Sequence, residues 1–242
     1  MNIQSAYKYL KLYYNWRKKK DHSEPSKLIV ILVLLQSKFN FGFDIKYNAL
    51  SIEDAISKVY QNIPDNVFKN DVYRQYYLYA AYQKQISIEN ICMKIDSIGI
   101  SKENGHEIIE LVLALMYLTK KNMKYIKDVE NILITLVYLL EFSDLKTEAV
   151  YILFLVNPYA VKRKWIDEIV KNQQNDGSLV CNGFGKYKDA QAHHTALGLI
   201  LYISYSKFKK LQKIIKYVGV IFVIFIYVYV YFSLKQYKAN DY

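Results

Sequence analysis

The sequence has few of the residues that cross-link, break or loosen a chain. Its 242 residues include two cysteines, three prolines and eight glycines. Two cysteines cannot form the disulfide framework of a small secreted domain, so a reducing, cytosol-facing environment is the simpler inference. All three prolines fall between segments of helical periodicity, where a missing N–H group breaks no helix.

Familiar catalytic and targeting motifs are also absent. The sequence contains no H-E-x-x-H, no G-x-S-x-G, no phosphate-binding loop and no dinucleotide fingerprint. No zinc peptidase, α/β-hydrolase, P-loop or Rossmann chemistry can therefore be assigned by motif. Residues Met1–Lys20 are polar, basic and rich in tyrosine, which is unlike a secretory signal peptide.

The charge is strongly basic but scattered. The net charge is +11, and the basic residues are spread along the chain, with short clusters at Arg17–Lys20, Lys162–Lys164 and Lys207–Lys216. None forms a long stripe interleaved with aromatic residues, and no nucleic-acid-binding motif is present. We therefore expect solvated faces and membrane-surface contact rather than nucleic-acid binding.

One long uncharged run stands out near the C-terminal end. Tyr217–Leu234 has eighteen residues without a charge, close to the ~20 residues that a helix needs to cross a bilayer. Alternating Val, Ile and Tyr leave a buried strand or a core helix as alternatives. Because the remainder of the chain has no strand to pair with, we predict a membrane helix.

Flanking charge predicts its orientation. Five lysines precede the run within Lys207–Lys216, and only Lys235 and Lys238 follow it, with Asp241 beyond. The positive-inside rule then places the large N-terminal part in the cytoplasm. Because eight residues follow Leu234, we expect a tail anchor, with the preceding lysines drawn to anionic head groups.

Before this segment the periodicity is helical throughout. We predict an all-α domain over residues 1–206, followed by a basic juxtamembrane segment and anchor over 207–242. Ser51 and Ser87 are expected N-caps. The predicted helices are Ile3–Lys19, Ser26–Lys38, Ser51–Gln61, Asn70–Gln85, Ser87–Ser97, Gly105–Thr119, Tyr125–Glu141, Leu145–Leu155, Lys162–Asn172 and Ala190–Ser206.

Alternate helices differ in character, as in arrays of paired helices. Some are apolar nearly all round and are expected to be buried, whereas Ser51–Gln61 and Lys162–Asn172 carry a polar face. The starts of three buried-type helices, near Glu107, Thr147 and His194, lie about 40 and 47 residues apart. Such spacing is typical of both open solenoids and closed toroids.

The segment Asp144–Leu201 resembles a repeat of the terpenoid cyclase and protein prenyltransferase superfamily. Trp165 and the run Gln173-x-x-Asp176-Gly177-x-Leu179 are similar to its Q-x-x-D-G-x-W element, with Leu179 in place of the tryptophan. The Asp189 to Leu197 stretch, D-x-x-x-H-H-T-A-L, is similar to the start of an inner helix. The resemblance implies a partial α/α toroid, in which the glutamine ties one helix end to the start of the next.

The chemistry of that superfamily is only partly represented. No D-x-D-D acid motif is present, which argues against class II cyclisation, and the D-x-C zinc element of prenyltransferases has no counterpart. The resemblance places His194 at the position of the zinc-binding histidine. Gln173, Asp176 and Gly177 are expected to be structural, as a turn whose amides satisfy helix ends.

A candidate site follows from the residues at helix starts. His106, His193, His194, Asp189 and Cys181 lie at the starts of predicted inner helices or in the loop before one. In a toroid these starts meet at one rim, where a zinc or acid–base site could form. The same residue types also cap helices and interact with their dipoles, so metal binding, substrate contact and capping all stay open.

The sequence therefore supports two hypotheses about function. The first is a membrane-anchored toroid-like protein that binds a hydrophobic or peptide ligand in a central cavity. The alternative is a membrane-bound enzyme of the prenyltransferase or cyclase type, acting on an isoprenoid or lipid with His194, His193, Asp189 and His106 in its site. A purely structural interaction scaffold would have a filled centre.

Overall fold

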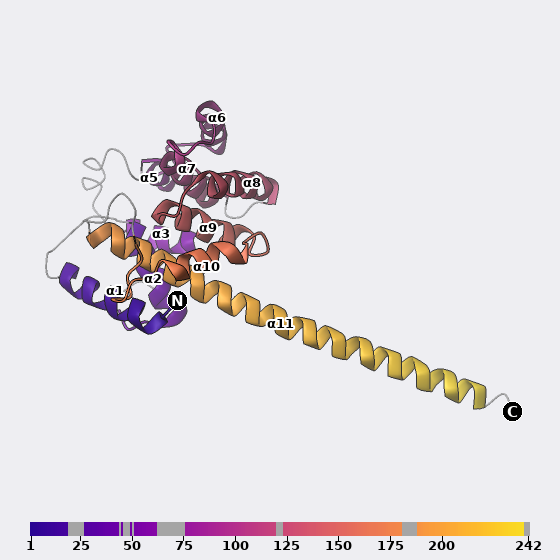
Figure 1. The fold of residues 1–242 in the computed structure, drawn as a ribbon. Helices are drawn as coiled ribbons and strands as arrows, with labels where there is room; N and C mark the ends of the chain where they lie inside the picture. The colour runs from indigo at the N-terminus through magenta and orange to yellow at the C-terminus, as the bar shows by residue number, and fades with distance from the viewer. Residues whose placement is uncertain are drawn as a thin grey trace. The chain divides into compact units, whose positions relative to one another are not determined.

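The computed structural model describes residues 1–18, 27–43, 45, 49, 51–61, 76–119, 123–180 and 188–239. The chain divides into two units, Met1–Tyr202 and Ile203–Tyr242. In the described ranges the regular elements are all helices, and the only β-pairing is an isolated antiparallel bridge between Gln173 and Leu179. The all-α prediction is confirmed (Figure 1).

Within the described residues the helices lie close to their predicted positions; residues 70–75 of the predicted helix Asn70–Gln85 lie outside the described residues. Their bounds are α1 Ile3–Lys18, α2 Lys27–Phe39, α3 Ile52–Tyr60, α5 Tyr76–Tyr82, α6 Ile88–Ile98, α7 Gly105–Thr119, α8 Met123–Leu139, α9 Asp144–Val156, α10 Arg163–Lys171 and α11 Lys188–Ala239. Sequential neighbours pack as pairs, α2 on α3, α6 on α7 and α8 on α9, while α7 also contacts α5 and α9.

Local chemistry fixes several of these helix starts. The hydroxyl oxygens of Ser51 and Ser87 accept hydrogen bonds from the third backbone N–H of α3 and α6, at 3.1 and 3.2 Å. Both predicted N-caps are thus confirmed, and Ser143 caps α9 in the same way. Each cap satisfies a donor that the helix itself leaves without a partner.

The contrast between buried and amphipathic helices is also confirmed. In α7 every residue from Ile108 to Met116 is buried, and in α9 every residue from Thr147 to Leu153. By contrast α10 buries only Trp165, Ile166 and Ile169, along one stripe. A helix that is apolar on all sides must be surrounded by other elements, whereas one with an apolar stripe can cover the outside.

One prediction differs in its boundary. The helix expected at Ala190–Ser206 and the separate membrane segment form a single helix, α11 (Figure 1). Between residues 203 and 216 there is no proline or glycine to end it. Helical backbone throughout Tyr217–Leu234 removes the alternative of a strand.

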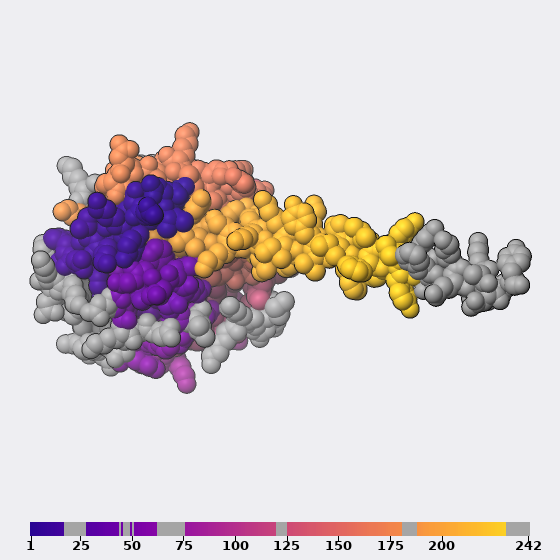
Figure 2. Space-filling view, turned by 90° about the horizontal axis from the view of Figure 1, so that it is seen from below, coloured from indigo at the N-terminus to yellow at the C-terminus, as the bar shows by residue number. Residues whose placement is uncertain are grey.

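Residues far apart in sequence meet where α1 contacts the segment between α10 and α11. The backbone N–H of Asn2 donates to Oε1 of Gln173 at 2.6 Å, and the Gln173 amide donates back to the Asn2 carbonyl at 3.0 Å. The Tyr9 hydroxyl reaches Gln191 in α11. Figure 2 shows α1, in indigo, lying against this orange segment. A full ring of inner and outer helices stays a prediction.

Gln173 therefore satisfies a helix end, but of a different helix from the one implied by the resemblance. It ties the end of α10 to the start of α1, and its amide also donates to the Gly177 carbonyl at 3.0 Å. Inside the turn, Asp176 Oδ1 accepts from the Ser178 N–H and hydroxyl at 2.9 and 2.7 Å. This is an Asx-type turn held by its own side chains.

Glycine is required at the tip of this turn for two reasons. Gly177 has a φ of +93°, and a Cβ there would lie 2.2 Å from the backbone carbon and oxygen of Ser5. We expect Gly177→Ala to destabilise Met1–Tyr202 by about 3 kcal/mol, through strain and lost docking of α1. Denaturant unfolding followed by tryptophan fluorescence measures this, because both tryptophans lie in Met1–Tyr202.

The matched control is Gly99→Ala at the end of α6. Gly99 has a φ of +64°, but a Cβ there meets nothing within 4 Å. The Gly99→Ala variant therefore reports backbone strain alone, which we expect to lower the stability by about 1 kcal/mol. Equal losses in the two variants would show that the contact of Gly177 with Ser5 does not stabilise the fold.

Candidate functional site

His194, the candidate singled out by the resemblance, lies in the protein interior. It is fully buried on α11, and its Nε2 is 2.9 Å from Oγ1 of Thr147 in α9, which is also buried. The Phe142 ring packs against the imidazole, with 5.2 Å between centroids. The histidine therefore joins α9 to the buried part of α11, as an internal hydrogen-bonding residue does.

The neighbouring hydrogen bond assigns the tautomer of His194. Thr147 Oγ1 is also 3.0 Å from the backbone carbonyl of Ser143, one turn earlier in α9. The hydroxyl has one proton, which it donates to this carbonyl as helical threonines do. The imidazole then donates its Nε2–H to Thr147. Its Nδ1 is buried and makes no hydrogen bond of full geometry within the described residues, although the Val180 backbone is close enough to favour a proton on the ring.

Burial keeps the His194 ring neutral. Loss of solvation is the main cause that lowers its pKa from 6.5 to about 4, and His193 adds to the effect. The Asp144 carboxylate and the Val180 backbone act in the opposite direction but do not reverse it. A neutral imidazole has the donor chemistry of a metal ligand or a base, but this ring is fully buried.

The other predicted site residues lie in different surroundings. Asp189 is exposed at the start of α11 and accepts a hydrogen bond from the Tyr13 hydroxyl. His193 is half-buried, and His106 is exposed at the second residue of α7. Cys181 lies outside the described residues. Asp189 thus serves to hold α1 against α11.

These candidates are not gathered into a metal centre in the described part of the chain. No group of three or more His, Cys, Asp or Glu side chains is placed there to hold an ion. Among the same residues, no hydrogen bond or ring contact joins His106 to the other candidates. The arrangement agrees with the capping and packing alternative for Asp189 and His194.

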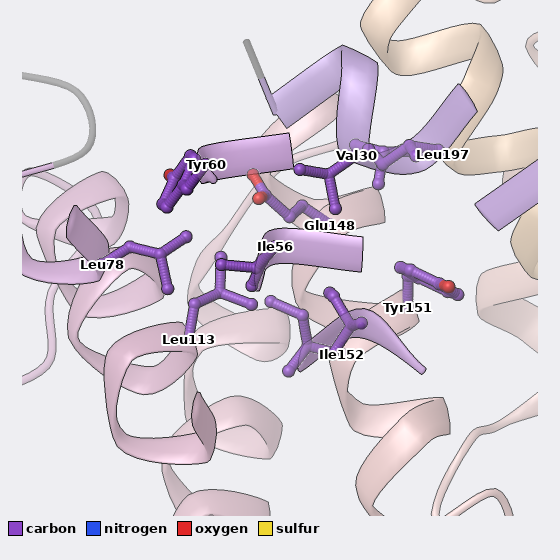
Figure 3. Close-up of a pocket in the computed structure, with 11 residues that line it drawn as sticks. Val30, Ile56, Tyr60, Leu78, Leu113, Glu148, Tyr151, Ile152 and Leu197 are labelled. Atoms are coloured by element: carbon purple, nitrogen blue, oxygen red, sulfur yellow. The ribbon is translucent and has the colours of Figure 1, made fainter. Parts of the chain in front are cut away.

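A polar group at the centre of the domain was not predicted from the sequence. A cavity of about 30 Å³ lies where α2, α3, α5, α7, α9 and α11 meet (Figure 3). Its lining is mostly aliphatic, including Val30, Ile56, Leu113 and Leu197, but it also contains Glu148 and two tyrosines. The signal available in the sequence was a glutamate directly before the apolar run Ala149–Val156 of α9.

Glu148 and the tyrosines give this centre its polar character. Figure 3 shows the Glu148 carboxylate extending from α9 toward Tyr60, and the Tyr151 hydroxyl pointing to the other side. Burial is the main cause that raises the pKa of Tyr60, with the carboxylate of Glu110 second. Burial likewise raises the pKa of Tyr151, followed by Glu53. Both phenols are therefore neutral at physiological pH.

The size of the cavity limits what it holds in this conformation. About 30 Å³ is the volume of one water molecule, whereas pockets for small organic ligands measure about 300–1,000 Å³. The Tyr151 hydroxyl is fully buried and has no hydrogen-bond partner in the described part of the chain. Tyr151 thus lines the cavity and also carries an unsatisfied hydroxyl.

Comparisons with known proteins add no relative. No family model, no curated protein and no solved structure matches the chain. The resemblance to the terpenoid cyclase and prenyltransferase superfamily therefore stays a prediction from the residues of Asp144–Leu201.

The lowered pKa of His194 predicts an acid-sensitive fold. Between pH 6.5 and 4 the unfolded chain protonates this residue and the folded chain does not, so stability falls as the pH falls through this window. The full loss is about 3 kcal/mol. Tryptophan-monitored unfolding at a series of pH values measures the slope.

Carboxylates also contribute to acid sensitivity. The test therefore compares the pH dependence of stability between wild type and variants. We expect His194→Asn to be less stable than wild type at pH 7 but to show a flatter decline from pH 6.5 to 4. His106→Asn, at an exposed position, is the matched control and should keep the wild-type slope. Parallel slopes for wild type and His194→Asn would contradict a neutral, buried imidazole.

Proposed function

We propose that this protein is a single-pass membrane protein whose helical N-terminal domain lies in the cytoplasm and binds a hydrophobic or peptide ligand. The observation that carries the membrane part is α11, a helix long and apolar enough to cross a bilayer. None of its most apolar eighteen-residue stretch is buried by protein. A core helix of the same composition would be covered by its neighbours.

The exposed apolar surface of this helix needs a non-aqueous environment. Every residue from Tyr217 to Val230 is exposed, including Phe222, Phe225 and Ile226. Soluble monomers rarely expose a continuous apolar patch larger than a few hundred Å². The helical backbone satisfies its own hydrogen bonds within the segment, as a bilayer demands.

The charge flanking the helix supports a cytoplasmic domain. Lys207, Lys209, Lys210, Lys213 and Lys216 all lie on the domain side of the apolar run, and no acidic residue occurs between Asp189 and Asp241. An excess of lysine at one end of a membrane helix marks the cytoplasmic side.

The apolar cavity supports the ligand part of the proposal. Six helices contribute its lining, so a modest separation of any pair would enlarge it into a site with mostly aliphatic walls. Glu148, Tyr60 and Tyr151 would offer the few polar contacts that orient a ligand. The alternative, an enzyme acting on an isoprenoid, has less support, because neither the candidate histidines nor Asp189 line this cavity.

The proposed topology predicts a defined protection pattern. In intact cells we expect a membrane-impermeant maleimide to leave the native Cys92, which is half-buried in α6, and an exposed Met93→Cys unlabelled. After selective permeabilisation of the plasma membrane, Met93→Cys should label. Extraction with alkaline carbonate should leave the chain in the membrane pellet.

A variant that should fail to insert serves as the control for the carbonate extraction. In it, lysine replaces Ile221 and Ile224 in the middle of the apolar run. Each lysine costs about 3 kcal/mol at the centre of a membrane helix, so the double variant should become extractable. Labelling of Met93→Cys in intact cells would contradict the cytoplasmic orientation. Carbonate extraction of the wild-type chain would contradict the anchor.

The ligand proposal predicts saturable binding at the centre of the domain. We expect a fluorescent isoprenoid of farnesyl length to bind the purified chain in lipid nanodiscs. Ile56→Trp, which fills the cavity, should weaken this binding at least about tenfold, a loss of about 1.4 kcal/mol. Met93→Trp, at an exposed position, should bind as wild type. Equal binding by both variants would place the probe elsewhere and overturn this part of the proposal.

A further inference from the structure

The segment of α11 just before the proposed membrane span is sharply two-sided. At about 100° per residue, Lys209, Lys210, Lys213 and Lys216 fall within an arc of about 120°. The opposite arc holds Leu211, Ile214, Ile215 and Val218. These four apolar side chains are 50–60% exposed. We call these two arcs the lysine face and the apolar face.

The lysine face carries charge that the chain itself does not neutralise. Lys209 donates a hydrogen bond to the Gln212 amide oxygen at 3.0 Å and lies over the Tyr205 ring, while Lys210, Lys213 and Lys216 have no ion pair among the described residues. No acidic residue occurs from 190 to 240. The face therefore presents up to four positive charges to whatever lies next to it.

The two faces also differ in apolar length. Along the apolar face, hydrophobic residues begin at Leu211 and continue to Phe232, 22 residues or about 33 Å. Along the lysine face they begin only at Tyr217, which leaves about 27 Å. The hydrocarbon core is about 30 Å thick, so one face is slightly too long for it and the other slightly too short.

From this asymmetry we propose that α11 enters the bilayer tilted, with the apolar face of residues 211–218 in the acyl region and the lysine face against anionic phospholipid head groups. Tilting buries the longer face and lifts the shorter one, which relieves both mismatches at once. The lysine stems lie along the surface while their ammonium groups reach phosphate and carboxylate oxygens. This inference rests on the proposed membrane span.

An upright helix and a tilted one predict opposite orders of depth. Lys213 is two residues nearer the membrane centre than Leu211, so an upright helix places residue 213 deeper. A tilt toward the apolar face places residue 211 deeper. The experiment uses the full chain in nanodiscs of phosphatidylcholine with phosphatidylserine, with both native cysteines replaced by serine. Spin labels are attached at Leu211→Cys, Lys213→Cys or Ile224→Cys, and the ratio of oxygen to nickel accessibility reports depth.

We expect the label at 211 to have a several-fold higher oxygen-to-nickel ratio than the label at 213, with the label at 224 higher still. An equal or lower ratio at 211 than at 213 would overturn the tilt. Spin–spin broadening at 211 would overturn it too, because it would show a second copy covering the apolar face. A nickel-accessible label at 224 would instead overturn the membrane span and, with it, the inference.

The preference for anionic lipid is tested by comparing nanodiscs with and without phosphatidylserine. Removing phosphatidylserine should make the label at 211 several-fold more accessible to nickel. Replacing Lys209, Lys210 and Lys216 by glutamine should abolish this dependence on lipid charge. The same replacement of Lys162, Arg163 and Lys164, another basic cluster of three, is the matched control and should preserve it. Loss of the lipid dependence in both variants, or in neither, would overturn the assignment of anionic lipid to the lysine face.

Discussion

The close approach of the Gly177 turn to the start of α1 is the constraint on which the rest of the domain depends. The turn leaves no room for a side chain at residue 177, and from it hydrogen bonds extend into α11. The Ser178 hydroxyl accepts from Gln191, and the Leu179 N–H donates to Thr195 Oγ1. Since His194 adjoins Thr195, the same turn that holds α1 also fixes where the buried imidazole meets α9.

Burial then decides the chemistry of the interior. His194, Glu148 and two phenols lie among aliphatic side chains, and loss of solvation favours the uncharged forms of the imidazole and phenols. The hydrogen bond between His194 and Thr147 lowers the free-energy cost of burying the imidazole, because it satisfies one ring nitrogen. A polar group in such a place contributes to a specific helix pairing, here α9 with α11, more than to reactivity.

Much of this fold could be predicted because local sequence patterns determine where its helices begin, end and become buried. Apolar periodicity located the helices, Ser51 and Ser87 marked two starts, and the uniformly apolar composition of α7 and α9 indicated burial. The partner of Gln173 could not be predicted, because the contact joins residues that are far apart in the sequence and no local pattern identifies the distant backbone. The cavity around Glu148 was missed for a related reason, since its lining comes from six helices and no single segment shows it.

The two parts of α11 show how one helix can meet two different surroundings. Where protein packs on it, the helix has small residues at Ala192, Ala196 and Gly198 among larger buried ones, and a Cβ at Gly198 would lie 2.3 Å from the Leu179 side chain. In the proposed membrane segment Gly219 has nothing within 4 Å, and its neighbours are large. Close backbone approach requires small side chains, whereas lipid tails adapt to large ones. The surroundings of Gly198 and Gly219 therefore differ between the part of α11 that protein covers and the part that we propose lipid covers.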